Sequence, residues 1–467
     1  MRNDMENPFS LTIMQSDMRL HVLGLNGREA LNQPYRFDLD LIGQEPPISP
    51  DALLGQAAFL RLDGESGIHG IVHSVSLSAE AAHRVGYRLT LVPYIQQLEQ
   101  GLRRRVFHRL TVVQILQRLL EENAIPALSY RFELPNGHYP CRPFCIQYEE
   151  SDLTLLQRLC EEEGIHYHFE HSPLGHVMVF AEDPKSFPVQ AVELLMEADK
   201  VGAITRLYQR HHSIPPGPPH GFRDRAAAET TDTANPASEA AAHERKRDDP
   251  TRIHRFQAGR RHLERLRYRK REIHGHTLSP ALRSGHIARI DGHPVSTFND
   301  QWLITEVRHR GRQFSILETN LPTPPAAKDY RNQFCAIPWS SVYRPLLVHP
   351  KPCVPGNHLA YVLGPPGQAA TSDLQGRVMV SLWNRDDEGI ALPVSCLTPG
   401  DHPSLLAGSE VLVSFLDGDP DRPVLCVGLL EPGPGNGGPT SPRPLAPSND
   451  NTGLLFEWLL NPPDITP

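Results

Sequence analysis

The chain has 467 residues, too many for one hydrophobic core, so about three domains are expected. Its 46 Lys and Arg against 54 Asp and Glu give a formal net charge of −8, which disfavours a nucleic-acid binder because such proteins need clustered cations. The sequence has no run of about eighteen apolar residues and no apolar segment within Met1–Ser10, so neither stable membrane insertion nor a signal peptide is expected.

The N-terminal part of the chain is predicted to be mainly β. Apolar and polar residues alternate through Leu11–Leu41 and Ala58–Leu91, the period of strands with one buried face. The spacing becomes helical between Leu110 and Ile125, and Pro126 ends the run. One face of this helix carries Val112, Leu116, Leu119 and Leu120, and the opposite face exposes Glu121 and Glu122.

The segment Cys145–His171, CIQYEESDLTLLQRLCEEEGIHYHFEH, predicts a second short helix followed by a strand. Ser151 is the expected N-cap and Gly164 the expected left-handed C-cap. The apolar residues at helical spacing are Leu153, Leu156, Leu159 and Cys160. In the strand, Ile165, Tyr167 and Phe169 alternate with His166 and His168, which is typical of a half-buried strand. The two helices therefore frame a small α+β insert.

Beyond Pro188 the pattern returns to β and then dissolves. Residues 214–250 are rich in turn-forming, Ala and polar residues and predict a long surface excursion. The basic run RRHLERLRYRKREIHG from Arg260 fits either a helix or an exposed strand, and we favour a solvated face over a nucleic-acid patch. Strands return in Leu282–Leu321, where Asp291-Gly292 and Asn299-Asp300 mark turns.

A proline-rich connector is predicted from Ala336 to Gln368, because proline stiffens the chain and withholds backbone donors. Alternating runs then predict a small barrel. Its buried faces hold Val378, Val380 and Leu382, and later Val411, Val413 and Phe415. In the following GDPDRP turn, Asp419 and Asp421 are expected to bond nearby backbone donors, and Arg422 to pair with one of them.

No enzyme active site is expected. The chain has no GxSxG elbow, no GxxxxGK[ST] phosphate loop and no GxGxxG after a strand. Asp417, Asp419 and Asp421 have the spacing of calcium ligands, but Arg422 and Gly428 replace the glycine and glutamate that such a loop needs. A structural turn is therefore favoured over a calcium site.

Two further clusters have the residue types of a site. His166, His168 and His171, with Cys141 and Cys145 upstream, suggest zinc, but no paired CxxC or HExxH spacing supports it, and a partly exposed strand is favoured. The consecutive carboxylates of Glu161, Glu162 and Glu163 point in different directions on a helix and are expected to be solvated. The seven cysteines are interpreted as reduced thiols. No catalytic residue, cofactor or metal is assigned.

Three segments carry a resemblance to a known family: Cys145–His171, the tryptophan strand Trp302–Arg310 and the GDPDRP turn. They resemble the VgrG family, the valine-glycine repeat spike (tip) proteins of type VI secretion, which are related to the baseplate hubs and spikes of contractile phage tails. The resemblance covers about Phe9–Glu431 and implies a mainly β fold with an α+β insert, two similar β-barrel hub domains and an oligonucleotide/oligosaccharide-binding (OB) fold barrel. The implied ranges are 9–105 and 191–330 for the hub barrels, with the polar excursion at 214–250 in the second, 106–190 for the insert, 331–370 for the connector, 371–431 for the OB-fold spike base and 432–467 for a Gly/Pro tether and apolar tip.

The resemblance also implies partners and a location. Three chains form a homotrimer whose pseudo-sixfold hub docks on an Hcp-like tube protein among sheath and baseplate components. The spike end carries a PAAR-type tip protein, an adaptor or a toxin effector. Such a protein is cytoplasmic while it assembles and is then secreted by the apparatus. The alternative is the baseplate hub of a contractile phage tail or tailocin.

The end of the chain departs from the family pattern. Family members typically continue into a long triple-stranded β-helix needle, whereas about 36 residues follow Glu431 here, and those up to Pro447 are dominated by Gly and Pro. We therefore expect a short form without the needle. The apolar tip is too short to span a membrane and is expected either to dock on a partner or to pack as a helix on its own trimer. Its docking residues are Leu454, Leu455, Phe456, Trp458, Leu459 and Leu460.

Overall fold

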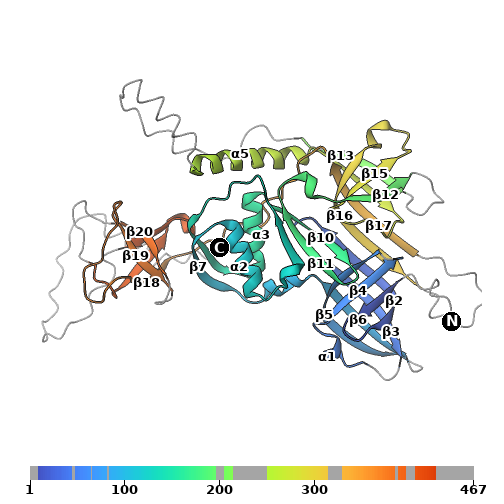
Figure 1. Ribbon diagram of the computed structural model, residues 1–467, viewed down its shortest axis with the longest axis horizontal. Coiled ribbons are helices and arrows are strands. Elements are labelled where there is room, and N and C mark those ends of the chain that lie inside the picture. The colour runs from blue at the N-terminus through green and yellow to red at the C-terminus, as the bar shows by residue number, and fades with distance from the viewer. Residues whose placement is uncertain are drawn as a thin grey trace, which may run out of the picture.

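The structure is a computed structural model that describes residues 9–44, 48–64, 66–80, 84–195, 204–213, 250–313, 329–383, 388–395 and 405–426. These residues form an elongated molecule with a large β body at one end, a small barrel at the other and a helical insert between them (Figure 1). The expected mainly β fold class is confirmed. No helix within the described ranges is long and apolar enough to cross a membrane.

The first half of the β body is a closed ring of six strands. They are β1 (Ser10–Ile13), β2 (Met18–Ala30), β3 (Gln33–Gln44), β4 (Ala57–Asp63), β5 (Ser66–Glu80) and β6 (Arg84–Val92), with the one-turn helix α1 (Pro50–Leu53) before β4. The hydrogen-bonded order is β1-β4-β5-β6-β3-β2, and β1 also pairs with β2, which closes the ring. The predicted alternation is confirmed, because residues such as Leu11, Leu39 and Leu89 fill the interior with no exposed surface.

The second half is an open sheet joined to the first edge to edge. Its strands are β12 (Val189–Leu195), β13 (Ile204–His211), β14 (Arg271–Thr277), β15 (Ile287–Asp291), β16 (Gln301–Arg312) and β17 (Asp329–Pro338). The order is β13-β14-β17-β16-β15-β12, and β16 pairs with β2 of the ring from Glu306↔Ala30 to Arg312↔Gly24. Within the described residues β12 and β13 do not pair, so the expected two similar barrels are one closed ring and one open sheet.

The insert contains the two predicted helices. Its elements are β7 (Arg103–Leu110), α2 (Val112–Glu122), β8 (Tyr130–Glu133), β9 (Arg142–Glu150), α3 (Asp152–Glu163), β10 (His166–Ser172) and β11 (Gly175–Ala181). Thr111 begins α2 with a capping box, in which its hydroxyl accepts from Gln114 N and its own N–H donates to the Gln114 side chain. The buried faces of α2 and α3 share one core with the ring.

The small barrel is made of five strands: β18 (Asn357–Val362), β19 (Arg377–Leu382), β20 (Ile390–Ser395), β21 (Glu410–Phe415) and β22 (Pro423–Cys426). They close in the order β18-β19-β20-β22-β21. The two predicted apolar faces, on β19 and β21, lie in its core. The range expected for the connector overlaps two strands that belong to other domains. β17 pairs with β16 of the open sheet, and β18 is the first strand of the barrel. The connector proper is therefore residues 339–356.

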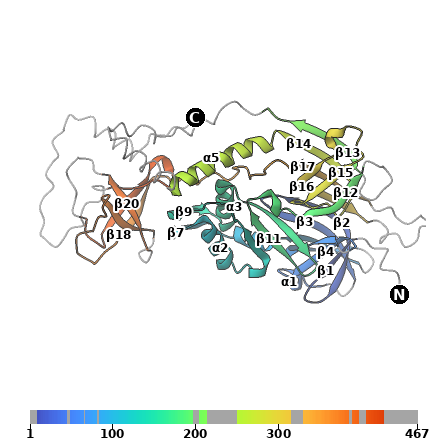
Figure 2. The same ribbon diagram turned by 45° about the horizontal axis from the view of Figure 1, so that its top comes forward.

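Residues 260–268 of the basic run belong to a helix, α5 (Pro250–Tyr268), which lies across α3 along one side of the molecule (Figure 2), and the last residues of the run belong to β14. The expected solvated face is wrong for two of its arginines, because Arg261 and Arg265 are buried. The predicted excursion at 214–250 falls, except for its last residue, outside the described residues.

Candidate functional site

The place where the insert, α5, the connector and the small barrel meet, which we call the hub-to-barrel junction, is built around α3. Ser151 caps its first turn by accepting a hydrogen bond from Thr154 N at 3.1 Å, and Gly164 ends it with φ 66° and ψ 26°. Both caps are as predicted. A Cβ at Gly164 would lie 2.9 Å from Arg261 Cδ, so the glycine also lets α5 approach α3 closely.

Glu163, at the end of α3, lies among two arginines and a histidine. Its carboxylate is 2.8 Å from Arg142 Nη2, 3.0 Å from Arg261 Nη1 and 3.0 Å from His254 Nε2. Burial alone would raise the pKa of Glu163, but His254 and Arg142 lower it to about 2. The expectation that this carboxylate is solvated is therefore wrong, because it is a buried ion-pair partner that joins α5 and β9 to α3.

Glu161, two residues before Glu163 on α3, binds the connector. It accepts hydrogen bonds from Val348 N at 2.8 Å and His349 N at 2.9 Å, and its other oxygen lies 2.7 Å from His349 Nδ1. Its side chain is only 5% exposed, so the prediction of solvation fails here too, whereas Glu162 keeps partial exposure beside Arg142 and Arg158. Two carboxylates of the predicted run thus hold different segments on α3: Glu163 binds α5 and β9, and Glu161 binds the connector.

Two buried arginines complete the attachment of the connector. Arg344 donates from Nη1 to Gly164 O at 3.1 Å and to Glu182 O at 2.7 Å, and from Nε to Glu264 at 2.7 Å. Arg265 donates to Pro345 O at 2.8 Å and to Glu161 O. Because these donors bind backbone carbonyls of non-adjacent segments, the connector is fixed by the hub as well as stiffened by its prolines.

The small barrel is seated on the insert by apolar contact. Ile146 and Tyr148 of β9 belong to the same buried cluster as the barrel residues. The Tyr148 ring lies 5.9 Å from the Trp383 ring and 5.5 Å from the His358 ring, measured between centroids. Because of this shared core, the barrel is held by the insert as well as by the connector.

The GDPDRP turn closes the barrel beside the connector. As predicted, Asp419 accepts from a nearby backbone donor, Asp421 N, at 3.0 Å. Arg422 pairs with Asp417 at 3.0 Å and not with the expected Asp419 or Asp421, which lie beside Lys351 of the connector. The three aspartates thus have protein cations as partners, in agreement with a structural turn.

The histidines of β10 do not converge on a metal. His166 and His168 are each 1% exposed, so the prediction of a partly exposed strand is wrong for the first half of β10: residues 166–169 are buried on both faces, whereas the last three residues of the strand are partly or fully exposed. His166 stacks on Phe187 at 4.4 Å, whereas His171 lies on the opposite face against Tyr35. Of the two cysteines considered with them, Cys141 is exposed and Cys145 lies in the core. The six described cysteines are all free thiols, and burial raises the pKa of Cys145 to about 11.

A polar groove of about 890 Å³ opens between the ring, α3 and the connector. Its lining includes Arg28, Arg36 and Arg308, which are paired with Glu306, Asp38 and Glu306 at 3.1, 3.0 and 2.6 Å. No Ser, Thr, Cys or Lys lines it. The lining of this groove therefore offers no hydroxyl, thiol or amine nucleophile of these four residue types. The candidate docking residues from Leu454 to Leu460 lie outside the described residues, as do those of the whole tip.

A family model described as the phage tail baseplate hub (GPD) matches residues 28–314, more than half of the chain. The chain belongs to this family. Among curated baseplate-hub relatives, the type VI secretion system spike proteins VgrG5 and VgrG4b of Pseudomonas aeruginosa are 38% and 37% identical to it over 447 and 458 residues. The alignments cover 89% of this chain and 56% and 55% of those proteins, so the chain spans about half the length of the curated relatives it matches.

Solved hub-family structures share the fold. The Escherichia coli c3393 protein, described as a component of the type VI secretion system with structural similarity to the T4 bacteriophage tail proteins gp27 and gp5, matches with a TM-score of 0.68 and 24% identity. That match covers 89% of this chain and 98% of the other. A Francisella PdpA-VgrG complex matches with a TM-score of 0.58 and 8% identity, over 93% of this chain and 79% of that one. The resemblance to the VgrG family is confirmed.

Sequence reasoning located α3 and its caps but missed its partners in the junction: Arg261, Arg265, Arg344 and His349. The sequence did contain a signal for buried ion pairs, because the five arginines within Arg260–Arg269 are too many to lie on a single exposed face of a helix. Pairing them with Glu161 and Glu163 required knowing that α5 crosses α3.

Proposed function

We propose that this baseplate-hub chain is a structural hub and spike subunit of a type VI secretion system. Three copies form a homotrimer whose hub docks on an Hcp-like tube protein among sheath and baseplate components. The other end carries a PAAR-type tip protein, an adaptor or a toxin effector. The protein assembles in the cytoplasm and leaves with the apparatus. The observation that carries the proposal is the hub-to-barrel junction, which fixes the small barrel at one end of an elongated hub (Figure 1).

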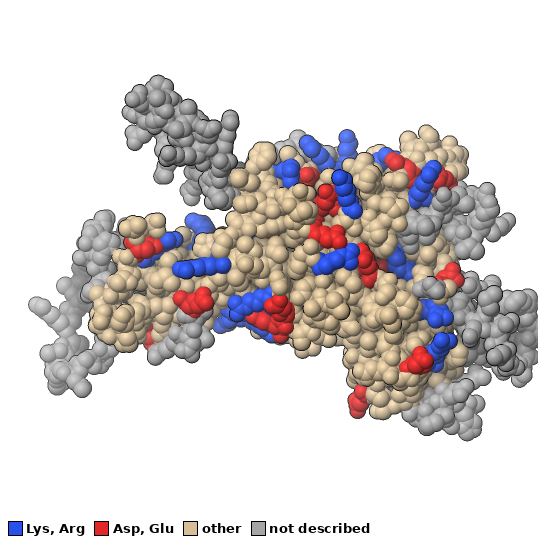
Figure 3. All heavy atoms as spheres, in the orientation of Figure 1, with Lys and Arg blue, Asp and Glu red and all other residues tan. Residues whose placement is uncertain are grey.

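The small barrel fits the role of an OB-type spike base. Its five strands close in the order β18-β19-β20-β22-β21, with β20 and β22 parallel and the other neighbours antiparallel, as in a five-stranded Greek-key barrel. We do not assign it the nucleic-acid binding known for other OB barrels. On the face shown in Figure 3, basic and acidic side chains alternate and no continuous basic stripe follows the barrel.

A mechanical role, with no enzymatic step, agrees with the interior of the molecule. The carboxylates that look like an acid/base cluster in sequence are ion-paired or hydrogen-bonded supports of the junction, and no Ser, Thr, Cys or Lys lines the polar groove. The polar and charged groups therefore serve to hold segments together.

A second candidate is the baseplate hub of a contractile phage tail or tailocin. The family model that matches residues 28–314 favours it, because its description is of a phage tail hub. The geometry required of the chain is the same in both cases. What differs is the tube on which the hub sits and whether a toxin is carried.

The test is the mass of the purified full chain by light scattering, alone and mixed with tube proteins. We expect three chain masses at micromolar concentration, and co-elution with an Hcp-type tube protein in preference to a phage-type tube protein. A chain that stays monomeric alone and with either tube protein would refute the hub role, and preference for the phage-type tube would support the second candidate. Deletion of residues 451–467 tests the apolar tip: unchanged assembly together with unchanged capture of tip proteins or effectors would exclude docking by Leu454–Leu460.

A further inference from the structure

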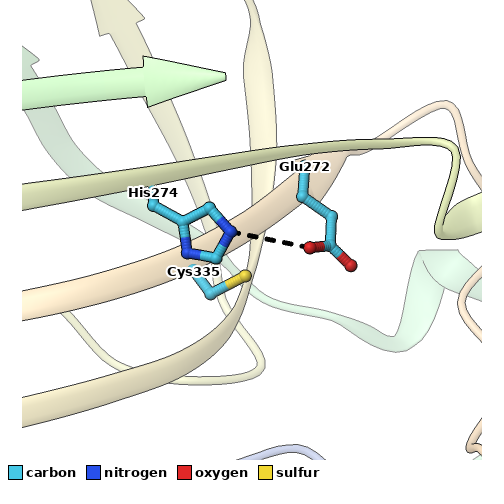
Figure 4. Close-up of side chains that lie close together, drawn as sticks. All are labelled: Glu272, His274 and Cys335. Carbon is cyan, nitrogen blue, oxygen red and sulfur yellow. Dashed lines mark ion pairs between the residues drawn. The ribbon is translucent and has the colours of Figure 1, made fainter. Parts of the chain in front are cut away.

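A cluster of metal-ligating side chains lies on the open sheet, away from the hub-to-barrel junction. Glu272 and His274 are two residues apart on β14 and so point to the same face, and Cys335 of β17 lies directly opposite His274 in the strand pairing (Figure 4). One ligand atom from each of the three lies within 4.8 Å of the other two. All three are partly buried, which places the cluster within reach of solvent.

The spacing in this cluster is that of a coordination shell. The distance from His274 Nε2 to Glu272 Oε2 is 3.6 Å, and His212 Nε2, just beyond β13, lies 3.5 Å from the same oxygen. These distances exceed those of ordinary hydrogen bonds, which end near ~3.2 Å. The distance between His274 and Glu272 matches the edge of a tetrahedron around zinc, which is about 3.4 Å for bonds of about 2.1 Å. His274 Nε2 is buried without a hydrogen-bond partner, as an available ligand atom would be.

We propose that Glu272, His274 and Cys335 bind a zinc(II) ion as three protein ligands, with the fourth position open to water. A thiolate, an imidazole and a carboxylate together suit zinc, whereas calcium and magnesium prefer oxygen ligands throughout. The surroundings already hold the ligands in place. The Tyr208 ring stacks on the His274 ring at 5.0 Å and 10°, and Thr305 donates from its hydroxyl to Cys335 O at 3.1 Å.

The ion would fasten two neighbouring strands of the open sheet to each other. Cys335 belongs to β17, and Glu272 and His274 belong to β14. The proposal is argued from these three residues alone and does not depend on the proposed function. Cysteine binds zinc as the thiolate, so zinc binding at neutral pH releases the Cys335 proton as the S–H bond is exchanged for a zinc–sulfur bond.

The test uses the full chain stripped of metal and titrated with zinc against a chromophoric chelator, and separately with cobalt(II). We expect one zinc per chain, release of about one proton per zinc and a cobalt–thiolate charge-transfer band. Cys335→Ser should abolish the band, and Cys335→Ser and His274→Ala should each weaken zinc binding by about 100-fold or more, beyond the loss seen for outer-shell changes. His212→Ala removes a neighbour of the Glu272 carboxylate, as an outer-shell change, and should weaken zinc binding by about tenfold.

Two control variants separate this site from other thiols and histidines. His276→Ala changes the next residue on the same face of β14, and Cys353→Ser removes an exposed thiol of the connector. Both should bind zinc as the parent chain does. Absence of a thiolate band in the parent chain, or equal zinc affinity in Cys335→Ser and the controls, would overturn the proposal. The parent-chain spectrum decides even where a ligand variant fails to fold.

Discussion

Replacement of Glu163 by glutamine tests whether the ion pairs of the hub-to-barrel junction stabilise the fold. In the folded chain the pKa of Glu163 falls from 4.5 to about 2, a difference of about 2.5 units at ~1.36 kcal/mol each. The carboxylate charge therefore contributes about 3 kcal/mol at neutral pH. A loss of stability of the same size is expected from the contacts, because glutamine carries no charge and leaves Arg261, which is 2% exposed, without the anion that lies 3.0 Å away.

The pH dependence has a definite sign. Because the folded pKa is depressed, the contribution of Glu163 is fully present above about pH 4.5 and is lost as the pH falls toward 2. The difference in free energy of unfolding between the parent chain and Glu163→Gln should thus be about 3 kcal/mol at pH 7 and should shrink steadily below pH 4.5. Other titrating groups are common to both proteins and cancel in this difference.

The assay is urea unfolding followed by circular dichroism at equal protein concentrations, with hydrogen exchange to locate the change in α3 and α5. Glu121→Gln is the matched control, since Glu121 is exposed on α2 and should lose no more than about 0.5 kcal/mol. If Glu163→Gln lies within 1 kcal/mol of the control, or if its deficit is the same at pH 3 as at pH 7, the assigned role of the carboxylate is wrong.

Three further changes probe other parts of the molecule. Gly164→Ala should cost about 2 kcal/mol because its φ is 66° and its new Cβ meets Arg261, whereas Gly292→Ala, with φ 77° in open space, should cost about 1 kcal/mol in the same urea assay; equal costs would deny the close contact. Tyr148→Ala should loosen the seat of the small barrel by about 3 kcal/mol and speed proteolytic cleavage of connector residues 339–356, and an unchanged cleavage rate would contradict the shared core. Burial lowers the pKa of His69 to about 4 and of His176 to about 3, so the unfolded chain takes up protons before the folded chain does as the pH falls below 6.5. The free energy of unfolding should therefore drop by about 2 kcal/mol per histidine between pH 6.5 and 5. A melting temperature that stays constant over this range would refute the prediction.

Local signals in the sequence were sufficient for the elements of the insert. Ser151, Gly164 and the spacing of leucines between them specify α3, because caps and helical periodicity depend on neighbours within a few residues. Burial of polar groups was not predictable in this way. Glu163 meets Arg261 across 98 positions of sequence, and a solvated carboxylate and a buried paired one have the same local pattern.

The same limit applies to β10 and to the proposed zinc ligands. Alternation of His166 and His168 with apolar residues indicated one solvent-exposed face, but these two histidines pack on Phe187 and are buried. Glu272 and His274 share a face by their spacing alone, whereas Cys335 joins them only because β14 pairs with β17 in the register that sets His274 opposite Cys335. Registers between distant strands are set by the whole sheet and not by either strand.

The position of β16 has a consequence for how the hub tolerates changes in length. Residues Glu306–Arg312 of this strand bond to β2 on one side and to β17 on the other. A single-residue insertion or deletion there would exchange inward and outward side chains along both seams at once. Such a change would turn buried side chains of β16 away from the core and would disturb its pairing with both halves of the hub, so two neighbouring strands constrain the length of β16 at once.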